Sequence, residues 1–166
     1  NTSTYMGMLL SKTFEDEQSI LDFIHNEVIS KIPENLSSYT AFYLIVPESF
    51  SEMSEMFRTK FDELFGPKVF GRVFTYEQTK HAKTVVHDEK ELFISFGVEN
   101  TIFGNGENRI FIPLPEDVDY ASLLAIGYFC IGHIQKQLPP YYKNRIEAYT
   151  KETSDVFGVT ITPIVT

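Results

Sequence analysis

Apolar residues recur along the chain at two spacings, one typical of helices and the other of strands. Residues 13–32 show the helical spacing, with Thr13 as a candidate N-cap and Pro33 as the end of the pattern. Residues 51–65 show it again and stop before Gly66 and Pro67. Both segments are therefore predicted to be amphipathic helices that keep their charged side chains in water.

Residues 39–46 form a nearly continuous run of β-branched and aromatic side chains, which predicts a central strand buried on both faces. Shorter runs of the same kind follow between residues 68 and 113, separated by turn candidates at 88–90 and 105–106. We expect an antiparallel meander there, with Asn105-Gly106 as a hairpin turn. Its strands would be residues 68–75, 83–87, 92–96, 101–103 and 109–113, and residues 76–82 fit a helical turn instead.

The two ends of the chain carry further strand patterns, at residues 4–10 and 157–165. Asp119 caps a predicted apolar helix at residues 120–138, and a more polar amphipathic helix follows at residues 141–153. The predicted order is β-α-β-α-β-β-β-β-α-α-β. That order indicates an α+β fold with a mixed or mainly antiparallel sheet packed against three to four helices.

Length and composition indicate one globular domain over residues 1–166, because 43% of the residues are hydrophobic and no repeat or long linker interrupts the chain. The longest apolar stretch, residues 121–134, is shorter than the roughly 20 residues of a membrane span, so it predicts a core helix. The single cysteine, Cys130, excludes an intramolecular disulfide and is typical of a reducing compartment, so we expect a cytoplasmic protein.

The formal net charge of −9 is unevenly distributed, with the excess of acids in residues 1–66 and 91–135. Residues 1–66 hold eleven acids against four bases, whereas residues 136–166 hold four bases against three acids. Nucleic-acid binding needs clustered Lys and Arg to neutralise phosphates, so this balance disfavours it. A basic protein partner is compatible with it.

Two small groups of residues are candidates for chemistry. The first joins Glu77 and His81, four residues apart, to His87 and Asp88, and the second pairs Cys130 with His133 as a nucleophile and base. Neither group matches a metal or catalytic motif, so we assign no catalytic residue and expect no metal and no cofactor. An enzyme built on one of these groups is kept as an alternative function.

The feature that departs most from an average chain is its aromatic content of 14%, which includes nine tyrosines. Tyrosine is favoured at protein interfaces because its ring supplies contact area while its hydroxyl keeps a hydrogen bond. Together with the acidity, this predicts a protein-binding or immunity-type inhibitor domain that acts on a basic macromolecular partner. A structural subunit of an assembly is a further alternative. The predicted partner-binding residues are Glu15, Asp16, Glu52, Glu55, Asp62, Tyr141 and Tyr142.

Overall fold

The computed structural model describes residues 2–163 and has an α/β architecture. Four strands form one sheet in the order β2-β1-β3-β4, and all three pairs of neighbouring strands are parallel. The strands are β1 (Ala41–Val46), β2 (Phe70–Thr75), β3 (Glu91–Phe96) and β4 (Arg109–Ile112). The predicted α+β fold with a mixed or mainly antiparallel sheet is therefore wrong.

Strand β1 lies in the middle of the sheet, hydrogen-bonded to β2 on one side and to β3 on the other. Five of its six residues are buried, as are all six residues of β3. Such continuous burial is typical of strands that are covered on both faces in a parallel sheet. The prediction of a central strand at residues 39–46 is confirmed, although the strand begins two residues later.

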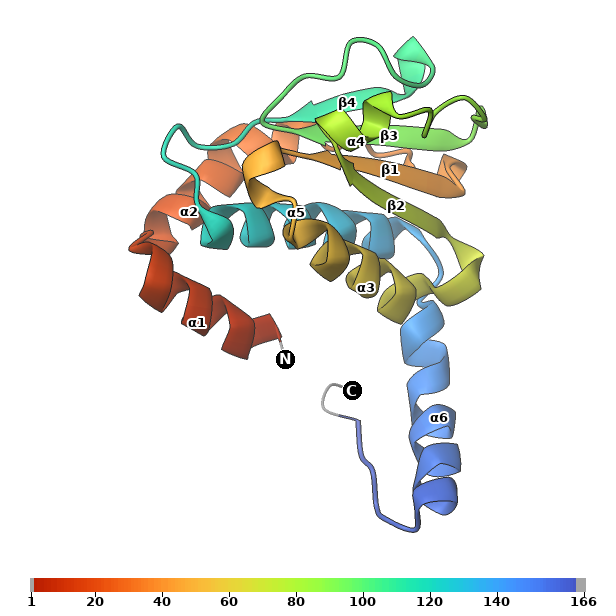
Figure 1. Cartoon of the computed structure of the whole chain (residues 1–166). Coiled ribbons are helices and arrows are strands. Elements are labelled where there is room, and N and C mark those ends of the chain that lie inside the picture. The colour runs from red at the N-terminus through yellow and green to blue at the C-terminus, as the bar shows by residue number, and fades with distance from the viewer. Residues whose placement is uncertain (1, 164–166) are drawn as a thin grey trace.

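Two helices cover one face of the sheet, α3 (Met53–Phe65) and α5 (Tyr120–Gln137) (Figure 1). Alternate side chains of β1 belong to the core beneath them, among them Leu44. Gly127 of α5 lets this helix approach α3, because a Cβ atom there would lie 2.3 Å from the ring of Phe57. The helices predicted at residues 51–65 and 120–138 are confirmed, and no described helix combines the length and apolar character needed to cross a membrane.

The segment from residue 13 to residue 32 is not one regular helix. It contains α2 (Glu17–Phe23), a π-helical segment (Ile24–Val28) and a 3-10 turn (Ile29–Lys31). The N-cap is Asp16, whose carboxylate accepts a hydrogen bond from the Ser19 amide at 2.7 Å. Thr13 instead ends the preceding helix and donates to the Leu9 carbonyl, so the predicted cap was three residues too early.

The first element of the chain is a helix, α1 (Thr2–Thr13), where residues 4–10 were predicted to be a strand. It packs against α5, and Met6, Leu9 and Leu10 contact the core. These three residues are spaced as on one side of a helix, and an isolated strand of this length at the chain end would have needed a neighbour in the sheet. The strand prediction is wrong.

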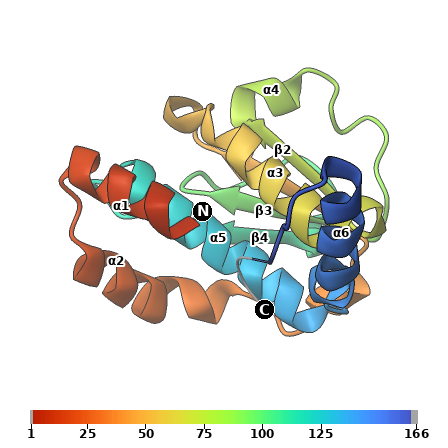
Figure 2. The same cartoon turned by 90° about the horizontal axis from the view of Figure 1, so that it is seen from below.

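The last helix, α6 (Tyr141–Phe157), projects from the body beside the end of α3, and the following segment returns alongside it (Figures 1 and 2). The helix predicted at residues 141–153 is confirmed and continues for four more residues. The strand predicted at residues 157–165 is wrong as far as it is described, because Phe157 ends α6 and residues 158–163 form no strand. Residues 164 and 165 of that prediction lie outside the described residues.

The second face of the sheet is covered by the short helix α4 (Tyr76–Lys80) and by two loops, residues 81–90 and 97–108. The alternative of a helical turn at residues 76–82 is confirmed. The strands predicted at residues 83–87 and 101–103 are wrong, since both segments lie in these loops. Parallel neighbouring strands need a crossover connection, so the chain uses these residues to return across the sheet. Asn105-Gly106 leads into a 3-10 turn before β4 and does not close a hairpin.

Candidate functional site

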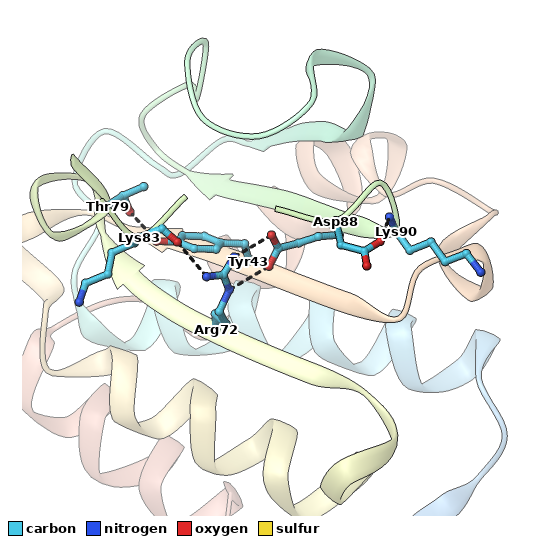
Figure 3. A network of polar contacts seen from close by, with 7 residues as sticks. Tyr43, Arg72, Thr79, Lys83, Asp88 and Lys90 are labelled. Atoms are coloured by element: carbon cyan, nitrogen blue, oxygen red, sulfur yellow. Dashed lines mark hydrogen bonds and ion pairs between the residues drawn. The ribbon is translucent and has the colours of Figure 1, made fainter. Parts of the chain in front are cut away.

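A buried polar network lies on the second face of the sheet (Figure 3). Arg72 of β2 and Glu91 of β3 form a bidentate ion pair with N···O distances of 2.7 Å, and the Glu91 side chain is only 4% exposed. Tyr43 of β1 lies between these strands, with the guanidinium carbon of Arg72 4.6 Å from its ring centroid. The Tyr43 ring stacks on Phe93 at 4.8 Å, and its hydroxyl donates to Thr79 at 3.2 Å.

This network fixes the loop of residues 81–90 to the sheet. Arg72 also donates to the carbonyl of Lys83, and within the loop the amide of Lys90 donates to Asp88 (Figure 3). Burial raises the pKa of Tyr43, whose side chain is fully buried, so the phenol keeps its proton at neutral pH. A substrate has no access to Tyr43, and we assign the network a structural role.

Next to the network, a hollow of about 560 Å³ opens between the two loops, with Thr84, His87 and Glu89 on one side and residues 102–105 on the other. The second wall is well fixed, because the Arg109 guanidinium donates to the carbonyls of residues 101–104. The imidazole of His87 and the carboxylate of Glu89, on the side formed by residues 81–90, are both exposed to solvent. The hollow therefore brings together polar groups without giving any of them an unusual environment.

The first group of candidate catalytic residues does not form a site. Of its four members only His87 lines the hollow; Glu77 forms an ion pair with Lys80 at 2.5 Å, and His81 is exposed. Within residues 2–163, no three side chains of His, Cys, Asp or Glu are placed to hold a metal ion. The structure therefore does not bring these four candidate residues together at the hollow.

The second group is also not a catalytic pair. Cys130 is 3% exposed, and burial raises the pKa of its thiol to about 12, so it is protonated at neutral pH. His133 approaches the carbonyl of Phe129 at 3.0 Å with its Nδ1 atom, and its ring packs on the Phe129 ring. A thiolate nucleophile activated by this histidine is not compatible with that arrangement.

A larger groove of about 930 Å³ lies between the C-terminal half of α3 and the N-terminal half of α6, with the end of α5 behind it. It contains three of the predicted partner-binding residues, Asp62, Tyr141 and Tyr142, which the sequence places almost eighty residues apart. Six of its thirteen lining residues are apolar or aromatic, namely Leu64, Phe65, Tyr141, Tyr142, Ile146 and Tyr149.

Three bases and two acids line the groove, and they differ in their partners. Arg145 pairs with Glu152 of the same helix. Lys60 pairs with Glu63 at 2.5 Å within α3. The side chains of Asp62 and Lys143 have no ion-pair or hydrogen-bond partner among residues 2–163. The rim therefore carries one free acid and one free base beside an apolar interior, an arrangement that suits a polypeptide better than a small charged ligand.

The other predicted partner-binding residues lie away from this groove and are mostly engaged within the chain. Asp16 caps α2, and Glu55 forms an ion pair with Arg58. Glu52 lies near the Tyr120 hydroxyl, at 3.4 Å. The structure therefore does not gather the predicted acidic residues into one free surface, and the predicted basic partner stays a prediction.

Glu15 is the clearest example of an internal role. Its carboxylate accepts hydrogen bonds from the amides of Asp119, Ala121 and Ser122 at 2.8–3.1 Å, which are the orphan donors at the start of α5. Burial alone raises the pKa of Glu15, but the hydrogen bonds led by that from Ser122 outweigh it and lower the pKa below its ordinary value. Glu15 thus links the α1–α2 connection to the N-terminus of the core helix.

We expect Glu15→Gln to lower the free energy of unfolding by about 0.5–2 kcal/mol at pH 7, the usual range for losing a helix cap. Because the folded pKa of Glu15 is depressed, its contribution is present above the unfolded pKa and is lost as the pH falls through the folded pKa. The difference in the free energy of unfolding between Glu15→Gln and the native chain should therefore become smaller at acidic pH. Urea unfolding at several pH values measures this, and Glu99→Gln, at an exposed site, is the control.

Among the residues that line the groove, the predicted partner-binding set lacks the apolar and aromatic residues Leu64, Phe65, Ile146 and Tyr149. The first two belong to the apolar side of a helix that was predicted correctly, so nothing in their spacing distinguishes a groove from the core. Tyr149 lies seven residues after Tyr142, and that spacing was the available signal for a shared side of α6.

Comparisons of the chain with protein-family models, with curated proteins and with solved structures find no significant match.

Proposed function

We propose that this chain is a protein-binding domain and that a polypeptide binds in the groove between α3 and α6. The observation that carries the proposal is the tyrosine-rich wall of this groove, where Tyr141, Tyr142 and Tyr149 of α6 lie beside the apolar side chains of the interior. Tyrosine supplies large contact area at a low cost in side-chain entropy, and it is enriched where protein surfaces meet.

The exposure of α6 supports the same proposal. Only Thr150 of this helix is buried, whereas Tyr149, Val156 and Phe157 are 55%, 79% and 69% exposed. An isolated amphipathic helix gains little stability in water unless its apolar side is covered. A bound polypeptide would cover both the groove and this side of α6.

Inhibition of a basic enzyme is a narrower form of this function, predicted from the net charge alone. Its support from the acidic side chains of α3 is limited to Asp62, which lines the groove without an ion-pair partner among the described residues. A cytoplasmic location likewise stays a prediction. Binding of a polypeptide in the apolar groove requires neither of them.

Photo-crosslinking tests the proposal in the cells that make the protein. A p-benzoylphenylalanine replaces Tyr149 in one version of the full chain and Val86 in the other. Both positions are exposed, but Val86 lies in the loop of residues 81–90 on the opposite side of the sheet. We expect a discrete light-dependent product from position 149 alone, weakened by Tyr142→Ala. Equal products from both positions, or none from position 149, would contradict the proposal.

A further inference from the structure

An apolar stripe runs along α6 from the groove to the exposed end of the helix. Tyr142, Tyr149 and Val156 recur every seven residues and therefore lie on one side of the helix. Tyr142 is half-buried at the groove, and the exposed fractions of Tyr149 and Val156 are 55% and 79%. Apolar side chains at one position of a seven-residue repeat form a single line along a helix, which a second helix can cover.

The charged residues beside this stripe are self-complementary: the stripe of one copy carries both a base and an acid that can pair with those of a second copy. Arg145 and Glu152 lie on the same flank of the stripe, four residues before and three residues after Tyr149, and form an exposed ion pair at 2.7 Å. If two α6 helices crossed antiparallel at Tyr149, each Arg145 would lie within one residue, about 1.5 Å along the axis, of the level of Glu152 of the other helix. The same helix thus supplies both halves of two ion pairs, as a two-fold symmetric contact requires.

The net charge of the chain also favours this surface for contact between copies. Residues 136–166 hold four bases against three acids, whereas residues 1–66 hold eleven acids against four bases. Two copies of a chain with net charge −9 repel each other least where the local charge is close to zero. The projection of α6 from the body leaves this surface accessible (Figure 1).

We propose that the polypeptide bound at the groove is α6 of a second copy of this chain. The two α6 helices run antiparallel, with Tyr149 at the two-fold axis and Val156 of each copy packed against Tyr142 at the groove of the other. This inference rests on the proposed function, because it names the partner of the same groove. It makes the chain a symmetric dimer whose contact combines an apolar seam with two reciprocal ion pairs.

The first test is the oligomeric state of the purified chain, measured by sedimentation velocity over a wide concentration range. We expect a dimer whose dissociation constant rises by at least about tenfold in Val156→Asp, because a carboxylate then enters the apolar seam. Val86→Asp is the matched control, since Val86 is 84% exposed and lies on the other side of the sheet. Circular dichroism checks that both variants keep their helices.

The second test uses charge reversal. Its expected result cannot arise from the ion pair within one helix. In Arg145→Glu alone, two acids of each copy face two acids of the other, and in Glu152→Arg alone bases face bases. We expect each single variant to dimerise at least about tenfold more weakly than the native chain. An equimolar mixture of the two should form a heterodimer with nearly native affinity, because every facing pair is again of opposite sign.

The outcomes separate this inference from the proposed function. A chain that stays monomeric at all concentrations, or single variants that do not associate on mixing, would overturn the second copy as the partner. Crosslinking from position 149 to a different protein would then still support the proposed function. If Val156→Asp and both charge reversals leave the dissociation constant of the dimer unchanged, the dimer contact lies elsewhere. That result would overturn the inference as well.

Discussion

Leu44→Ala is expected to lower the free energy of unfolding by about 2–5 kcal/mol, the range for truncating a large buried apolar side chain. Leu44 has no exposed surface and lies in the central strand, opposite Val73 of β2 and Ile94 of β3. Neighbouring strands on both sides and helices above it leave little freedom for the cavity to collapse. Urea unfolding followed by circular dichroism measures the change.

The control for this prediction is Val86→Ala, at a position that is 84% exposed. A surface truncation of that kind should stay within about 0.5 kcal/mol. A cost for Leu44→Ala as small as that of the control would mean that β1 is not the centre of the sheet.

Arg72→Met is expected to cost about 3 kcal/mol of stability, the lower end of the range for breaking a buried ion pair. The substitution removes the cation but leaves the Glu91 carboxylate buried between strands with no counter-charge. It also releases the carbonyl of Lys83 and with it the anchor of the loop of residues 81–90. We place the cost at the lower end because the Arg72 side chain is 24% exposed and water can approach it.

The double variant Arg72→Met with Glu91→Met separates the cost of the stranded charge from the loss of packing. Replacing both partners of a buried pair with apolar groups is often nearly neutral, so the double variant should be more stable than Arg72→Met alone. If the double variant is the less stable of the two, the pair contributes directly to stability and the stranded carboxylate is not the main cost. Arg58→Met, which breaks an exposed pair with Glu55, should change little.

The groove between α3 and α6 could be predicted from the sequence only in part. Tyr141 and Tyr142 were identified from composition and from their place after two prolines, and both line the groove. The acidic residues Glu15 and Asp16 were assigned to a free surface, but their carboxylates accept hydrogen bonds from helix N-termini. A sequence shows that an acid stands before a helix; only the structure shows which helix it caps, since Glu15 caps one that begins more than a hundred residues later.

The sequence alone determined the helices α3, α5 and α6 and the buried strand β1, because the spacing of apolar residues along one segment records which of its sides are covered. It also determined that residues 68–113 contain strands, and β2, β3 and β4 do lie there. The tertiary structure decided that all strands pair in parallel, and it turned residues 83–87 and 101–103 into crossover loops. The physical reason is that a strand buried on both faces has the same apolar pattern whether its neighbour runs parallel or antiparallel to it. The direction of each strand is therefore set by how the connecting helices and loops pack across the sheet.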